Sequence, residues 1–136
     1  MPTQIADSIP AQDWRHITGR RSVSSEEFGS NGTGLWDKVM RELEAMRELE
    51  DDWDGLGARG PTAEIIDSAI GLAHLLHGRS MDAPTRVVPG PEGTVILEWQ
   101  DPDGSYSEVE VVRPFYAEVM AIEPGKPARH WVLPDA

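Results

Sequence analysis

The chain has 136 residues, of which 12 are basic and 24 acidic, and 39% are hydrophobic. This length and apolar fraction suit one domain with one core, and no segment approaches the roughly 20 apolar residues that cross a bilayer. The net charge of −12 repels phosphate backbones and anionic lipid, and the absence of Cys excludes disulfides and thiolate catalysis, so we expect a cytoplasmic protein that binds neither nucleic acid nor membranes directly.

The N-terminal stretch has no sustained helical or strand period, and its Ser-, Gly- and Asn-rich end is typical of a linker. We therefore predict a flexible arm over residues 1–33 and a single α+β domain over residues 34–136. Trp14 is an exception in the arm, because it stands beside Arg15 and His16 in an otherwise polar stretch. Such a Trp suits an anchor that binds a partner, and it equally suits a ring that folds back on its own domain.

The first periodic segment predicts an amphipathic helix from about residue 35 to residue 52. Ser30 or Thr33 is placed to cap its start, and Arg47 with Asp51 has the spacing of a stabilising ion pair. The apolar residues recur at steps of three and four, which is the period of a helix with one buried face. They are Leu35, Trp36, Val39, Met40, Leu43, Met46 and Leu49.

A second helix is expected after residues 54–61, where three Gly and a Pro interrupt the first. Thr62 is placed to cap it, and its period continues to about His77. Gly78 is expected to end it in the left-handed conformation, which Gly adopts without steric cost. Its predicted buried face consists of Ile65, Ile66, Ala69, Ile70, Ala73 and Leu76.

The remaining sequence is rich in β-formers, and its segments are separated by turns that contain Pro and Gly. The expected strands are residues 85–88, 94–100, 106–112, 115–122 and 129–133. Val95, Leu97 and Trp99 alternate with Ile96, Glu98 and Gln100, so one face of the sheet should pack on the helices. The fold predicted is α+β: a two-helix hairpin packed on an antiparallel meander of four to five strands.

The segment of residues 48–54 holds five carboxylates among seven residues, at the expected end of the first helix. Acids there oppose the helix macrodipole, which suggests a compensating role in binding. We therefore treat this segment and Trp14 as the candidate partner-binding residues, although a solvated helix end explains the same pattern. The acidic candidates are Glu48, Glu50, Asp51, Asp52 and Asp54.

Residues 50–55 also imitate the opening of a calcium-binding EF-hand loop. The match then fails, because Gly57 stands where an apolar residue is expected and Pro61 where the bidentate Glu is required. Trp53, within the segment, is interpreted as a core anchor that ties the turn to the sheet.

The stretch Trp53-Asp54-Gly55-Leu56-Gly57-Ala58 resembles a signature of small bacterial proteins, written roughly NWDGxGA, that have no assigned activity. The likeness covers about residues 35–112 and includes a hairpin like Pro91-Glu-Gly-Thr-Val-Ile-Leu-Glu-Trp99. This chain departs from the signature at Asp52, where Asn is common. The resemblance implies a shared α+β fold and a bacterial or phage origin, and it implies no activity.

No motif in the chain identifies a catalytic residue, since the Gly-x-Ser-x-Gly, phosphate-loop and His-Glu-x-x-His patterns are all missing. His74 and His77 have a spacing that permits joint metal ligation, but no third ligand is near in sequence, and we predict no metal and no cofactor. Glu98, Glu108 and Glu110 are expected on one face of the sheet, where alternating Glu is usually solvated.

Size, charge and the missing motifs favour a non-enzymatic protein-protein interaction module of bacterial or phage type, with a basic protein as its partner. An immunity, antitoxin or accessory-subunit role suits such a module. Two alternatives stay open: an acidic nucleic-acid mimic that blocks a nucleic-acid-binding cleft, and a small metal-dependent or carboxylate hydrolase.

Overall fold

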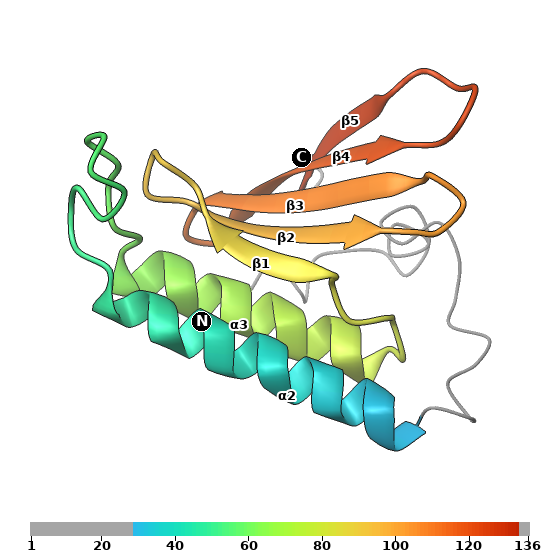
Figure 1. Ribbon diagram of the computed structural model, residues 1–136, viewed down its shortest axis with the longest axis horizontal. Coiled ribbons are helices and arrows are strands. Elements are labelled where there is room, and N and C mark those ends of the chain that lie inside the picture. The colour runs from blue at the N-terminus through green and yellow to red at the C-terminus, as the bar shows by residue number, and fades with distance from the viewer. Residues whose placement is uncertain (1–28, 134–136) are drawn as a thin grey trace.

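The computed structural model describes residues 29–133 and contains a helical layer and a sheet (Figure 1). The five strands are all antiparallel to their neighbours and lie in chain order, so the sheet is a meander. The predicted α+β class, with the helices before the strands, is confirmed. The elements are α2 (Gly29–Ala45), the 3-10 helix η2 (Met46–Glu48), α3 (Ala63–Gly78), β1 (Arg86–Pro89), β2 (Val95–Gln100), β3 (Tyr106–Arg113), β4 (Tyr116–Ile122) and β5 (Arg129–Leu133).

The core lies between the helices and one face of the sheet, as the alternation along the strands predicts. Val95, Leu97 and Trp99 face the helices and are buried, and Val109 and Val111 continue this face on the next strand. The helices contribute most of the expected stripes. Leu35 is an exception because it is 55% exposed, Ile70 is only partly buried, and Leu72 is an additional buried residue. The fully buried large side chains of the helices are Leu43, Ile66, Leu72 and Leu76.

Two Trp rings fix the segment between α3 and β1. The Trp36 indole N–H donates to the Met81 carbonyl at 3.0 Å, and the Trp99 indole N–H donates to the Asp82 carbonyl at 3.0 Å. Buried indoles need such an acceptor, because an unpaired N–H in the core costs free energy. This pairing joins α2, β2 and the α3–β1 connection into one core.

The first helix starts earlier and ends earlier than the sequence predicts. Helix α2 begins at Gly29, so Ser30 and Thr33 lie inside it and do not precede it. It ends at Ala45, and after η2 the backbone of Leu49 is extended, with φ −77° and ψ 130°. The acids from residue 50 onward therefore do not stand at a helix C-terminus, and the macrodipole argument does not apply to them.

The predicted Arg47–Asp51 pair is also wrong. Arg47 instead pairs with Glu44 at 2.7 Å and with Asp67 of α3 at 2.6 Å. The reason is the early end of the helix, since the i,i+4 spacing brings side chains together only while the backbone is helical.

Helix α3 is capped as expected at its start, but its end differs. The Thr62 hydroxyl accepts the Ile65 N–H at 3.3 Å. The left-handed residue at the C-terminus is Ser80, with φ 62°, and Gly78 is still helical. The Met81 N–H bonds to the Leu76 carbonyl and the Ser80 N–H to the His77 carbonyl, which is the hydrogen-bond pattern of a Schellman motif.

Candidate functional site

Four of the five acidic candidates lie in residues 49–61, which follow η2 and precede α3 and are named here the acidic loop; the fifth, Glu48, is the last residue of η2. In Figure 1 this loop projects at the end of the molecule where the β1–β2 turn also lies. The Arg59 N–H donates to the Pro91 carbonyl at 2.9 Å, and Arg59 forms an isolated bridge with Glu92. The loop is therefore held to the connection between β1 and β2 as well as to the two helices.

Three of the five candidate carboxylates accept hydrogen bonds from the backbone of the loop itself. Asp51 accepts the Gly60 N–H at 3.1 Å, and Asp52 accepts the Gly57 N–H at 2.7 Å. Asp54 accepts two, from Leu56 at 2.8 Å and from Ala58 at 3.0 Å. The bonds from Leu56 and then Ala58 hold the pKa of the Asp54 carboxyl below its ordinary value.

These bonds explain why the segment is a loop. Asp side chains compete for backbone amides and so favour turns over helix. Asp52 itself has a φ of 67°, in the left-handed region, and its N–H bonds to the Ala58 carbonyl at 2.5 Å. Gly60 lies so close to Leu49 that an added Cβ would stand 2.5 Å from the Leu49 carbonyl oxygen.

Trp53 has a different place from the one predicted. Its ring is only partly buried and does not belong to the main core cluster. The indole N–H donates to the Arg59 carbonyl at 2.9 Å, within the acidic loop. Trp53 thus closes the loop and is not a core anchor.

Glu48 and Glu50, the other two candidates, are exposed. Among the residues that the structure describes, neither forms an ion pair or accepts a side-chain hydrogen bond. Their charges are therefore available to a partner. Trp14, the remaining candidate, lies outside the described residues.

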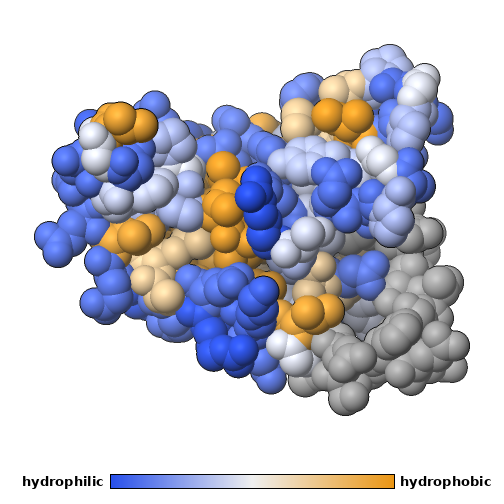
Figure 2. Space-filling model, in the orientation of Figure 1, coloured by the Kyte–Doolittle hydropathy of each residue, from blue (hydrophilic) through white to orange (hydrophobic). Residues whose placement is uncertain are grey.

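Sequence reasoning missed Leu56, which lies between Gly55 and Gly57 in the acidic loop. Its side chain is 88% exposed, the highest value among the exposed large hydrophobic residues described, which include Leu35 at 55%. Figure 2 shows apolar surface surrounded by hydrophilic surface at the tip of this loop. The available signal was an apolar residue between two glycines in an otherwise polar turn.

His74 and His77 do not belong to a metal-binding cluster of described residues. His74 is exposed, and His77 stacks on Trp36 with ring centroids 5.5 Å apart. Over residues 29–133, no group of three or more His, Asp or Glu residues is arranged to hold a metal ion.

The strand carboxylates share the outer face of the sheet, as expected, and each has a neighbour. Glu98 pairs with Arg86. Glu108 accepts the Tyr106 hydroxyl at 2.8 Å, and Glu110 accepts the Thr94 hydroxyl at 2.7 Å. Partial burial, followed by the bond to Glu108, raises the pKa of the Tyr106 phenol. These contacts hold side chains on the outer surface of the sheet, where Glu98 and Glu108 stand opposite each other on β2 and β3.

No protein-family model, curated protein or solved structure matches this chain. The likeness to the NWDGxGA signature consequently stays a prediction. No helix within the described part of the chain has the length and apolar character needed to cross a bilayer.

Proposed function

We propose that this protein is a non-enzymatic interaction module that binds a basic protein through its acidic loop, with Leu56 as the apolar anchor. The observation that carries the proposal is the exposure of Leu56 on a loop that its own Asp side chains hold in one conformation. An exposed Leu gains about 1.5–3 kcal/mol when it is fully buried. Burial of this side chain against a partner would therefore contribute directly to binding.

The hydrogen bonds of the loop also lower the cost of binding. A segment that is already ordered loses less conformational entropy when it docks, so more of the contact free energy appears as affinity. The bonds to Asp51, Asp52 and Asp54 thus support the proposed interface indirectly. These three residues shape the loop, and Glu48 and Glu50 supply free charge beside it.

The net charge of −12 supports a basic partner, because long-range attraction accelerates encounter with a positive surface. Charges on the rim of an interface act mainly on the association rate and make it sensitive to salt. We extend the proposal to an immunity, antitoxin or accessory-subunit role in a bacterial or phage cytoplasm, on the basis of the NWDGxGA resemblance.

The test is affinity capture at low salt with the full chain as bait, compared with two charge variants. One variant carries Glu48→Lys and Glu50→Lys, and its control carries Asp37→Lys and Glu118→Lys, which are exposed acids outside the loop. Both variants change the net charge equally, so only the position of the charges differs. We expect the wild-type chain and the control variant to capture a basic protein. The Glu48→Lys/Glu50→Lys variant should fail to capture it. Equal capture by both variants would refute the loop as the interface.

A further inference from the structure

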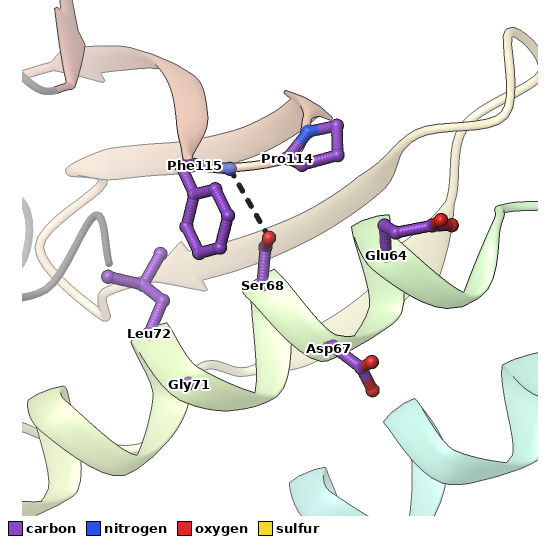
Figure 3. A pocket seen from close by; sticks show the side chains of 7 residues that line it. All are labelled: Glu64, Asp67, Ser68, Gly71, Leu72, Pro114 and Phe115. Carbon is purple, nitrogen blue, oxygen red and sulfur yellow. Dashed lines mark hydrogen bonds between the residues drawn. The ribbon is translucent and has the colours of Figure 1, made fainter. Parts of the chain in front are cut away.

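A cavity of about 180 Å³ lies between α3 and the turn that joins β3 to β4 (Figure 3). A cavity of about 150 Å³ with apolar walls is already large enough for a benzene ring, so this one has room for an aromatic or branched aliphatic side chain. One wall is a face of α3 and the other is the turn. The lining residues include Glu64, Asp67, Ser68, Leu72, Pro114 and Phe115.

The turn that forms the second wall has an unusual backbone. Phe115 has a φ of 61° and follows Pro114, the combination of a type II turn, in which Gly is the favoured residue at this position. The Phe115 N–H donates to the Ser68 hydroxyl of α3 at 3.2 Å. A bulky side chain in this region is rare and costs backbone free energy, so the ring at this place calls for an explanation.

A β-bulge on β3 directly precedes the turn. Val111 pairs with Ala117 and Arg113 with Tyr116, so Val112 is an extra residue on β3. Bulges re-aim the residues beside them and are common next to binding sites. Together the bulge and the turn place the Phe115 ring beside Leu72 and Ser68 (Figure 3), where it remains 39% exposed.

The two charged residues that line the cavity are both acidic. Glu64 and Asp67 stand at its rim, with their carboxylates pointing away from the Phe115 ring (Figure 3). Asp67 is paired with Arg47, whereas Glu64 is exposed and forms no ion pair with the described residues. Arg113, the nearest base along the chain, lies over the Tyr116 ring at 3.9 Å and does not line the cavity. The interior is apolar and the rim is acidic.

We propose that this cavity receives an apolar side chain, Phe or Leu, from a protein segment that carries basic residues beside it. The apolar side chain displaces water from the space between Phe115 and Leu72, and a neighbouring Lys or Arg pairs with Glu64. The inference rests on the proposed function only for the identity of the occupant as a basic protein. The cavity is a second contact, separate from Leu56.

The probe is the peptide acetyl-Lys-Phe-Lys-amide, titrated into the full chain while amide NMR shifts are recorded. We expect the shift changes to centre on Ser68, Gly71 and Phe115. Acetyl-Lys-Ala-Lys-amide and acetyl-Glu-Phe-Glu-amide should each bind about tenfold more weakly, because the first lacks the apolar group and the second has the wrong charge. Shift changes that centre elsewhere, or equal binding of the three peptides, would overturn the proposal.

Variants separate the cavity from the acidic loop. Phe115→Gly removes the ring and leaves the residue that the turn favours, so the chain should stay folded while the peptide affinity falls about tenfold. Glu64→Gln should weaken the binding of acetyl-Lys-Phe-Lys-amide without disturbing the fold. Ile122→Ala, which truncates an exposed side chain at the other end of β4, should change nothing. Unchanged affinity in Phe115→Gly would refute the cavity as the site.

Two further outcomes would also overturn it. Loss of peptide binding in Leu56→Ser would mean that the peptide binds the acidic loop, whereas retained binding supports a separate site even if the loop has no partner. Tighter binding, by about tenfold, in a Trp14→Ala chain would make the protein's own Trp14 and Arg15 the occupant in place of a partner.

Discussion

At the scale of single residues, the carboxylates of the acidic loop divide by what they contact. Asp54 accepts two backbone N–H groups, and Asp51 and Asp52 accept one each from the loop, whereas Glu50 is exposed and has no such bond among the described residues. Substitution of these acids should therefore have different effects, although the sequence presents them as one uniform run.

Asp54→Asn should lower the free energy of unfolding at neutral pH, because backbone bonds from Leu56 and Ala58 keep the pKa of Asp54 below its ordinary value of 3.8. A lowered folded pKa gives stability that is present above 3.8 and is lost as the pH falls through the folded value. The difference between wild type and Asp54→Asn should thus shrink from pH 7 to about pH 3 in denaturant titrations. Glu50→Gln is the control and should show little difference at either pH.

Trp36 in α2 and Trp53 in the acidic loop should differ in the same measurement. Trp36 is 2% exposed and hydrogen-bonded within the core, so Trp36→Ala should cost about 3–5 kcal/mol. Trp53 is partly buried and closes the loop through one hydrogen bond, so Trp53→Ala should cost only about 1–2 kcal/mol. Equal losses in the free energy of unfolding would indicate that Trp53 is part of the core.

At the scale of elements, the acidic loop depends on a close approach of its two ends. Gly60→Ala would place a Cβ 2.5 Å from the Leu49 carbonyl oxygen, so it should destabilise the fold by about 1–3 kcal/mol. Gly34→Ala is the matched control, because its Cβ meets nothing within 4 Å and the residue lies inside α2. Gly34→Ala should stabilise by about 0.5–1 kcal/mol, as removal of a helical Gly does. Thermal unfolding of the two variants compares them directly.

The elements themselves were largely predictable from periodicity, and their ends were not. Alternating burial of side chains predicted the strands, and apolar residues at steps of three and four predicted both helices, because each pattern buries one face of its element. The run at residues 46–52 continues the helical period, so nothing in the pattern marks its end at Ala45. What ends it is the competition of Asp51, Asp52 and Asp54 for amides that lie up to nine residues further along the chain.

At the scale of the whole molecule, contacts between distant segments could not be predicted from the sequence. The cavity joins Ser68 to Phe115, which are 47 residues apart, and only the packing of α3 on the meander brings them together. Leu56 was visible in the sequence, but its exposure depends on how the loop projects from both layers. Composition predicted the acidity of the surface and not where an apolar anchor stands on it.

The N-terminal segment allows a test of the domain boundary. Helix α2 begins at Gly29, so the deletion should end at residue 28, because removal of residues 1–33 would cut the first turn of the helix. We predict that a chain lacking residues 1–28 keeps its free energy of unfolding within about 0.5 kcal/mol of the full chain. A larger loss would place part of that segment in the core.

The most direct test of the proposed interface is the dissociation constant of the purified partner for two matched variants, Leu56→Ser and Leu35→Ser. Both remove an exposed Leu, one at the acidic loop and one on α2. We predict that Leu56→Ser weakens binding by about tenfold or more, which corresponds to about 1.4 kcal/mol, while Leu35→Ser stays within about twofold of wild type. Equal dissociation constants for wild type and Leu56→Ser would contradict it.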